Sequence, residues 1–397
     1  MRALIAGDIH IGRTVRGRSR LDEHRRILAS FLGAVDDNDV DVCVLPGDTF
    51  DSARPGPDEL RVFAEFLRGL IEREVQVIIT PGNHDGPTTL KALDGKVTSW
   101  LGAFPLERVH SLSDPSFLTL STLGGYRDPV DRGASHPMTG WSDYGFYTLP
   151  YPHKRSMDAL VDKSLRDRTE EVSKALENII ETEHERLFKE HPGLPLIFVG
   201  HLSVLNAELS ADQAMRLGWD VTIRREVLAG FRGAFLGHIH RQQPVIDSHS
   251  WYSGSPLYGD FGETTQTKGF LLWQDAVFTP VESDHLPMTR WDLYESQGWE
   301  LDDWPGTEGY VQIRLFPDKG GTPSWALKRQ LKASFTDAAG VWVDVMPRPT
   351  TSRVRLDPAV RTTVPDDVLV SYIRLNGIPE QPTLDVARSL MAAVDEA

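Results

Sequence analysis

Short apolar runs alternate with amphipathic stretches through the first 80 residues, and this alternation constrains the fold more than any other feature. The apolar runs at 2–7, 40–46 and 75–80 predict buried strands. Apolar residues recur at helical spacing over 21–35, and a second helical face follows Pro57. Strands that alternate with helices in this way predict a layered α/β fold.

The later sequence continues this fold and then adds a smaller module and a tail. A long, strongly charged helix is expected over 156–191, and its alternating signs are typical of a solvated face. Further strands are expected at 118–123, 147–150, 196–200, 234–237, 250–253 and 270–273. A strand–helix–strand pattern follows at 310–316, 325–335 and 341–346. We therefore predict a main domain over 1–285, a small α+β domain over 286–350, and a linker with two C-terminal helices over 351–397.

Charge and cysteine content exclude several classes of protein. The 397 residues carry a formal net charge of -15, whereas a protein that binds nucleic acid by charge alone would be basic. Cys43 is the one cysteine, so disulfide scaffolds and cysteine–zinc clusters are excluded within one chain. No apolar run is long enough to span a membrane, and the first residues are too polar for a secretory signal. A reducing, cytoplasmic setting is therefore expected.

Five short motifs rich in metal-binding residue types each follow a predicted strand. They are Asp8-Ile9-His10, Gly47-Asp48 with Asp51, Gly82-Asn83-His84-Asp85, Gly200-His201, and Gly237-His238-Ile239-His240. In an open α/β sheet, sites assemble at the carboxyl ends of the strands. Adjacent glycines allow the backbone to turn sharply and to approach a metal closely. One such dipeptide carries little weight, but five motifs in this order predict a single site.

The ligand types predict a two-metal centre. Carboxylates, imidazoles and one amide carbonyl suit manganese, iron or zinc better than calcium. In the DIH and HIH motifs, the outer two residues should project from one side of an extended chain. The first ion is assigned to Asp8, His10, Asp48 and His240. The second ion is assigned to Asp48, Asn83, His201 and His238, so the Asp48 carboxylate would bridge two ions about 3.5–4 Å apart.

These assignments predict a phosphoesterase that activates water with two cations. A bridging water would lose a proton near neutral pH and attack phosphorus. His84 is not a ligand in this scheme, and it is expected over the phosphate, where it would assist the leaving oxygen as a proton donor. Asp51 and Asp85 are predicted to orient these groups.

The ordered set of motifs resembles the calcineurin-like metallophosphoesterase superfamily, a layered β-sandwich flanked by helices. Within it, the chain is similar to the SbcD family, the nuclease subunit of bacterial SbcCD. The segments that carry this resemblance are DIHIG, GRSRLDEHRRIL, LPGDTFDSARP, ITPGNHD, LPYPHK, GHLSV, FRGAFLGHIHRQQPV and WYSGSPLYGDFGE. The resemblance covers roughly residues 1–263 and weakens beyond them.

The resemblance implies a manganese-dependent nuclease that repairs DNA by acting on duplex ends, single strands and hairpins. It implies two Mn²⁺ ions, with Mg²⁺ or another divalent cation as substitutes, a homodimer, and a capping domain over 286–350. The tail would bind an SbcC-type ATPase. The two tail helices suit docking to a partner, but packing on their own domain is an equal alternative.

Four arginines crowd the loop after the first motif, namely Arg13, Arg16, Arg18 and Arg20. At the rim of the site they would bind DNA phosphates, although a solvated loop is the alternative. Aspartate also stands at Asp51, where some members of the SbcD family carry histidine.

Two other functions remain open from the sequence. The first is a phosphodiesterase for a small substrate such as a cyclic nucleotide, which would use the same metals in a deep, closed pocket. The second is a scaffold whose catalysis is dispensable and whose tail recruits an ATPase. The arginine loop and the C-terminal modules favour the nuclease, because a small-molecule enzyme does not need them.

Overall fold

The computed structural model describes residues 1–86, 109–111, 115–121, 125–127, 144–153, 168–209, 213, 221–246, 249–299, 308–318 and 323–346. The chain forms two compact units. The first comprises Met1–Arg290, Gly306–Val311 and Asp337–Gly340, and the second comprises Trp291–Pro305, Gln312–Thr336 and Val341–Ala397. The predicted tail over 351–397 lies outside the described residues.

Two mixed sheets form the centre of the first unit. One sheet has the order β17 (Val277–Glu282), β16 (Gly269–Gln274), β1 (Arg2–Ile5), β4 (Val42–Pro46), β5 (Gln76–Thr80) and β6 (Val109–Ser111). The other has the order β14 (Gln243–Ile246), β15 (Ser250–Tyr252), β13 (Gly233–Gly237), β10 (Leu196–His201), β9 (Tyr144–Leu149), β7 (Ser116–Ser121) and β8 (Gly125–Arg127). Strands β1, β4 and β5 are parallel, as are β9, β10, β13 and β15, so their carboxyl ends lie at common edges.

Side-chain alternation along the strands builds three layers of core. In β4, Val42 and Val44 lie in the cluster between the two sheets, whereas Cys43 and Leu45 face the outer helices. In β10, Ile197 and Val199 join the inner cluster. This arrangement follows from the two-residue period of a strand, which sends successive side chains to opposite faces. Every position of β4, and every position of β10 before His201, is non-polar because both faces of each sheet are covered.

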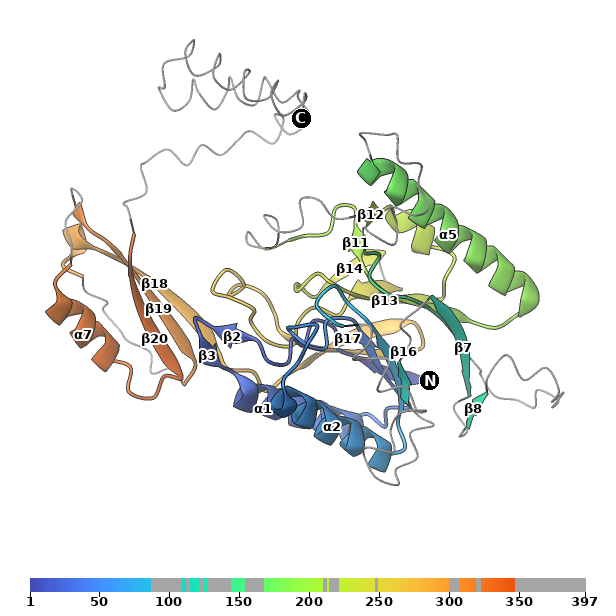
Figure 1. Ribbon diagram of the computed structural model, residues 1–397, viewed down its shortest axis with the longest axis horizontal. Coiled ribbons are helices and arrows are strands. Elements are labelled where there is room, and N and C mark those ends of the chain that lie inside the picture. Colours follow the sequence, from blue (N-terminus) through green and yellow to red (C-terminus); the bar gives the residue numbers. More distant parts are fainter. Residues whose placement is uncertain are drawn as a thin grey trace, which may run out of the picture. The chain divides into compact units, whose positions relative to one another are not determined.

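Helices cover the outer faces of both sheets (Figure 1). Helices α1 (Leu21–Asp37) and α2 (Pro57–Glu72) pack on the first sheet, and α5 (Arg168–Glu190) packs on the second. Proline at the first position of α2 has no amide hydrogen to leave unpaired, and two acidic residues follow it, which favours a helix start. The predicted layered α/β fold is confirmed. The charged helix predicted from 156 is described only from Arg168.

Smaller elements complete the described structure. The short pairs β2 (Thr14–Val15) with β3 (Arg18–Ser19), and β11 (Ser203–Val204) with β12 (Thr222–Ile223), lie in loops of the first unit. A three-stranded sheet has the order β18 (Met288–Tyr294), β19 (Tyr310–Phe316) and β20 (Gly340–Val345), and α7 spans Trp325–Ala333. The sequence predicted β19, α7 and β20 to within two residues but did not predict β18.

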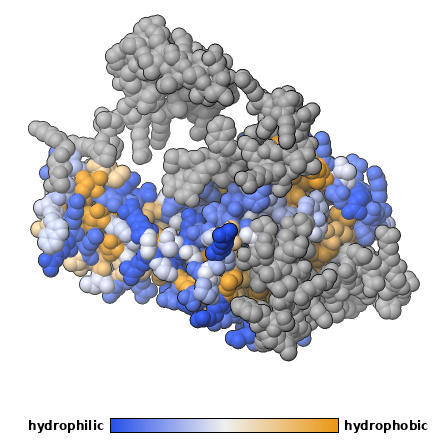
Figure 2. Space-filling view, viewed as in Figure 1, coloured by the Kyte–Doolittle hydropathy of each residue, from blue (hydrophilic) through white to orange (hydrophobic). Residues whose placement is uncertain are grey.

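Hydrophilic residues dominate the described surface on the face drawn in Figure 2, with smaller hydrophobic patches among them. Among the described residues, no helix combines the length and apolar character that crossing a bilayer requires.

Candidate metal centre

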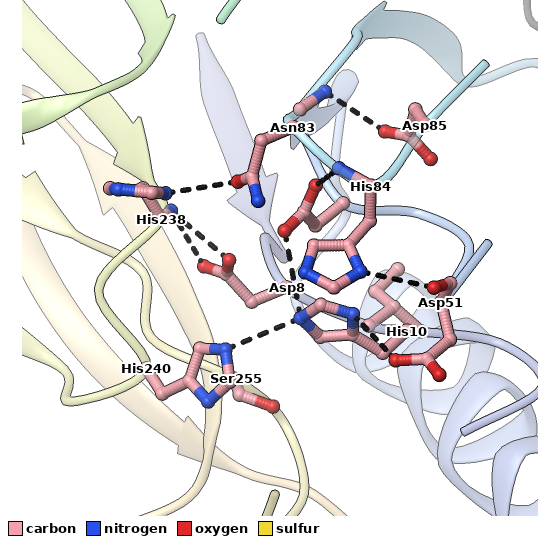
Figure 3. Close-up of polar contacts among 12 residues, drawn as sticks. Asp8, His10, Asp51, Asn83, His84, Asp85, His238, His240 and Ser255 are labelled. Carbon is pink, nitrogen blue, oxygen red and sulfur yellow. Dashed lines mark hydrogen bonds and ion pairs between the residues drawn. The ribbon is translucent and has the colours of Figure 1, made fainter. Parts of the chain in front are cut away.

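Loops at the carboxyl ends of five strands bring the predicted site residues together (Figure 3). Asp8 and His10 follow β1, Asp48 and Asp51 follow β4, Asn83, His84 and Asp85 follow β5, His201 ends β10, and His238 and His240 follow β13. Two backbone hydrogen bonds join the loops after β1 and β4: the Asp8 amide donates to the Gly47 carbonyl oxygen (3.0 Å), and the His10 amide donates to the Asp48 carbonyl oxygen (2.9 Å). Both sheets therefore contribute donors to one site.

The backbone at four of these donors is left-handed rather than extended, so the sequence-based expectation was wrong for Asp8, His10 and His238. Asp8, His10, Asp48 and His238 have φ values of 52°, 50°, 50° and 96°. Non-glycine residues rarely adopt this left-handed region, and each such residue costs on the order of 1–3 kcal/mol. Their concentration here, in tightly packed loops, means that the fold holds the side chains of the site in one geometry.

Two glycines allow the loops of the two sheets to meet. A Cβ atom at Gly47, where φ is 89°, would lie 2.1 Å from Nδ1 of His201. A Cβ atom at Gly237 would lie 1.9 Å from the carbonyl oxygen of Pro46. No larger residue fits at either position, so glycine is what allows the loops of the two sheets to approach each other here.

One group of donors surrounds His10. Its Nε2 lies 3.2 Å from Nε2 of His240 and 3.6 Å from Oδ2 of Asp48. The donor atoms of Asp8, His10 and His240 all lie within 4.8 Å of one another, and all three residues are buried. Nδ1 of His10 lies 3.2 Å from Oδ1 of Asp51, on the side of the ring away from these donors.

A second group of donors surrounds the Asn83 side chain. Its Oδ1 lies 3.0 Å from Nε2 of His201 and 3.1 Å from Nδ1 of His238. Oδ2 of Asp48 lies 3.5 Å from Nε2 of His201, so this carboxylate is shared by both groups. Nδ1 of His201 contacts the carbonyl oxygen of Pro46 at 2.8 Å, and that carbonyl fixes the nitrogen as a donor. The structure thus brings together all seven predicted metal-binding residues.

The donor set fits divalent cations. Nδ1 of His10 and Nδ1 of His240 each face a carboxylate, so when neutral both rings direct an Nε2 lone pair at the other. Two facing lone pairs repel unless a proton or a cation lies between them. Ligand nitrogens lie about 2.1 Å from a bound ion, and neighbouring ligands are then about 3 Å apart. The observed 3.2 Å separation matches that arrangement.

The pKa values of the histidines differ between the two groups of donors. Burial lowers the pKa of His10 to about 4, so its imidazole is neutral at pH 7. Burial also lowers the pKa of His201, but the adjacent Asp48 carboxylate outweighs this effect and raises it to about 9. Without an ion, a proton on His201 therefore offsets the negative charge of Asp48.

The three predicted catalytic and orienting residues lie together. The His84 imidazole is half-buried, and its Nδ1 contacts the carbonyl oxygen of Asp51 at 3.0 Å. Because that carbonyl accepts, Nδ1 is the donor in this contact, and Nε2 is the ring nitrogen that remains for a substrate. Asp85 is buried, and its carboxylate accepts amide hydrogens of Thr49, Phe50 and Gly82. Asp85 thereby joins the loops after β4 and β5.

Two buried residues at the site were not predicted. Glu263 contacts Nδ1 of His240 at 2.7 Å, and Lys268 contacts the other oxygen of that carboxylate at 2.7 Å. Glu263 is the final residue of GDFGE, a segment that pointed only to the family resemblance. No local pattern shows that this glutamate reaches a histidine 23 residues earlier.

The four predicted DNA-binding arginines differ in exposure: three reach solvent and Arg20 is buried. Arg16 and Arg18 are exposed on the β2–β3 hairpin, and Arg13 is half-buried. Arg20 is 1% exposed and donates to Glu23 and to the carbonyl oxygen of Tyr258. Its role at a DNA-binding rim was therefore predicted wrongly, because a guanidinium enclosed by protein partners cannot reach a phosphate.

The comparison with protein families matches residues 1–242 to calcineurin-like phosphoesterases. The chain belongs to the calcineurin-like phosphoesterase family. The resemblance drawn from the motifs is thereby confirmed, and the phosphoesterase class agrees with the buried clusters of Asp and His donors. These clusters support the use of a divalent metal by this phosphoesterase.

The phosphoesterase is similar to two known proteins that are each named as the SbcD component of the nuclease SbcCD. The one from Staphylococcus saprophyticus is 26% identical over 274 residues, which are 68% of this chain and 65% of that protein, slightly less than two thirds of its length. The one from Bacillus subtilis is 26% identical over 330 residues, 81% of this chain and 76% of that protein. Among solved structures, a Thermus thermophilus protein is 14% identical with a TM-score of 0.36, covering 71% of this chain and 98% of its own.

Proposed function

We propose that this phosphoesterase is a manganese-dependent DNA nuclease that hydrolyses phosphodiester bonds with two cations. The observation that carries the proposal is the convergence of two donor groups on a shared Asp48, in a chain similar to two proteins named as components of a nuclease. A carboxylate shared by two ions is the arrangement of two-metal hydrolases.

The cations would be held by the seven donors in two sets. The first is Asp8, His10, Asp48 and His240, and the second is Asp48, Asn83, His201 and His238. When bound, the cations would neutralise charge on the phosphate and lower the pKa of an attacking water. His84 would donate a proton to the leaving oxygen, and Asp51 would hold both the His84 and His10 rings in orientation. Asp85 would hold the two loops at a fixed separation.

The β2–β3 hairpin supports a polymeric substrate. Arg16 and Arg18 are exposed there, and the half-buried Arg13 lies between this hairpin and the donors. Within a chain of net charge -15, this basic segment would hold DNA phosphates beside the cations. We propose both exonuclease action on duplex ends and endonuclease action on single strands and hairpins.

The partner proposals rest on the relatives and on the sequence. Both relatives are named as components of SbcCD, and we propose an SbcC-type ATPase as a partner of residues 351–397. We also propose a homodimer, a capping role for residues 286–350 and a function in DNA repair.

The test is hydrolysis of end-labelled duplex and hairpin DNA by the purified chain in manganese, magnesium or chelator. His84→Ala should lower the rate about 10²–10⁴-fold, because general acid catalysis contributes that much. His184→Ala is the matched control, since this half-buried histidine on α5 bonds the Gly230 carbonyl oxygen and belongs to neither donor group. It should leave cleavage unchanged.

Cleavage that needs manganese and is lost in His84→Ala would support both the nuclease activity and the role of His84. Turnover of bis-nitrophenyl phosphate without DNA cleavage, even with the ATPase partner added, would overturn the DNA substrate and favour a small-substrate phosphodiesterase. Full DNA repair by a catalytically inactive His84→Ala chain in cells would favour the scaffold.

A further inference from the structure

A buried ion pair lies directly behind the His240 ring. Glu263 and Lys268 are 0% and 2% exposed, in the first compact unit. Oε1 of Glu263 lies 2.7 Å from Nδ1 of His240, and Oε2 lies 2.7 Å from Nζ of Lys268. Charged residues are seldom buried unless hydrogen bonds and ion pairs with their partners compensate for the loss of solvation. The contacts of this pair therefore point to a specific task.

The carboxylate determines which nitrogen of His240 faces the metal centre. A carboxylate accepts, so the His240 proton lies on Nδ1, and Nε2 presents its lone pair to His10. Lys268 and the Gly259 amide donate to Oε2, so Oε1 is left to accept from His240, and the ring cannot adopt the other tautomer without losing this bond.

Lys268 contacts the backbone of His240 directly and its side chain through Glu263. Besides Glu263, its ammonium donates to the carbonyl oxygen of His240 at 3.1 Å and to Gln266 at 3.0 Å. The lysine therefore links the backbone of His240 to the carboxylate that orients its side chain. Three acceptors satisfy the three hydrogens of the buried ammonium.

The loop that carries Glu263 is itself held at several points. The Gly259 amide donates to Oε2 of Glu263 at 2.8 Å, and the Arg20 guanidinium donates to the carbonyl oxygen of Tyr258 at 2.5 Å. A Cβ atom at Gly259 would lie 2.9 Å from Glu263 and 3.2 Å from His240. The carboxylate is therefore packed closely against Gly259 and is held by three donors, from His240, Lys268 and the Gly259 amide.

We propose that Glu263 and Lys268 are positioning residues that orient His240 toward one of the two cations, and toward that one alone. The inference rests on the proposed two-metal site. Neither residue touches the reacting atoms, because His240 stands between the pair and the site. Hydrogen-bonded partners behind a metal-binding histidine typically change metal affinity about 10–100-fold when they are replaced.

The experiment measures Mn²⁺ binding to the full chain by calorimetry, together with the visible spectrum of the Co²⁺-loaded protein. Glu263→Gln is expected to weaken one Mn²⁺ site about 10–100-fold and to leave the other unchanged. The matched control is Glu177→Gln, which alters a glutamate that is 6% exposed on α5 and whose carboxylate binds Arg224 rather than a proposed metal ligand. It should retain both affinities and the Co²⁺ spectrum.

A second variant covers the case in which Glu263→Gln does not fold. Lys268→Gln keeps the glutamate in place and can still donate to it, so a smaller loss at the same single site is expected. Unchanged affinities in the folded variants, or equal weakening of both sites, would overturn the positioning role while leaving the nuclease proposal intact. Two normal Mn²⁺ sites in a wild-type chain that cleaves no DNA would overturn only the proposed function, and a wild-type chain that binds no Mn²⁺ would overturn both.

Discussion

Nε2 of His10 and Nε2 of His240 lie 3.2 Å apart, although 230 positions separate these residues in the sequence. His10 follows a strand of the first sheet and His240 follows a strand of the second. A cation between them would therefore link the two sheets directly. Its contribution to folding is set by mass action, because the unfolded chain does not present the two rings together.

We expect Mn²⁺ to raise the melting temperature of the chain relative to chelator. At a concentration about 100 times the dissociation constant, a single ion adds about 2.7 kcal/mol to the free energy of unfolding. Differential scanning calorimetry at several Mn²⁺ concentrations would measure this. A melting temperature independent of Mn²⁺ would contradict the bridging arrangement.

Replacement of the shared carboxylate should affect both ions. Asp48→Asn is expected to abolish or strongly weaken both Mn²⁺ sites, because Oδ2 of Asp48 lies beside both His10 and His201. Asn83→Ala should weaken the second site alone, since its contacts are with His201 and His238. Titration calorimetry would give the number of ions bound, and Asp36→Asn on the exposed end of α1 serves as the control.

The two ions should differ in their dependence on pH. With a pKa of about 9, His201 is protonated at neutral pH in the metal-free chain, so an ion must displace a proton there. The affinity of the second site should rise about tenfold per pH unit up to about pH 9 and then level off. His10, with a pKa of about 4, releases no proton above pH 5.

Proton release can be measured by calorimetry in buffers with different ionisation enthalpies. Release of about one proton with the second ion at pH 7 is the expected result. Equal proton release by both ions would contradict the assignment of the neutral ring to His10 and the charged ring to His201.

Removal of the exposed hairpin charges should weaken DNA binding through electrostatics. The double variant Arg16→Ala, Arg18→Ala should reduce the slope of log K against log salt by about 2, about one for each phosphate that an arginine no longer neutralises. Fluorescence anisotropy of a labelled hairpin DNA without divalent ions would measure this. The control is Arg61→Ala, Arg68→Ala on α2, where both arginines have carboxylate partners four or fewer residues away.

Arg20 should behave differently from its neighbours in the loop. Arg20→Ala leaves the buried Glu23 without its cation, and breaking such a pair costs about 3–5 kcal/mol. Urea denaturation should show this loss. Arg25→Ala, which removes an exposed partner of Asp22 on the same helix, should change stability little. A stable Arg20→Ala chain with weakened DNA binding would reverse this interpretation.

Local sequence patterns were enough to predict the strands, their helices and the types of donor residue. Strand and helix periods are local properties, and motifs placed just after strands predict a common edge because parallel strands end together. For this reason β4, β5, β10 and β19 were predicted from the sequence alone, and so was the gathering of the seven proposed donors at one site. The same reasoning missed β18 and the end strands of both sheets, which are β17 and β6 in the first and β14 and β8 in the second.

Which atoms face one another was decided by tertiary packing. The left-handed backbone at Asp8 and His10, the Glu263–Lys268 pair behind His240 and the enclosure of Arg20 arise where loops of two sheets pack together. Burial and hydrogen-bond partners depend on residues distant in the chain, so an arginine in a basic loop has the same local pattern whether it faces solvent or a buried glutamate. Packing between the sheets supplies that information.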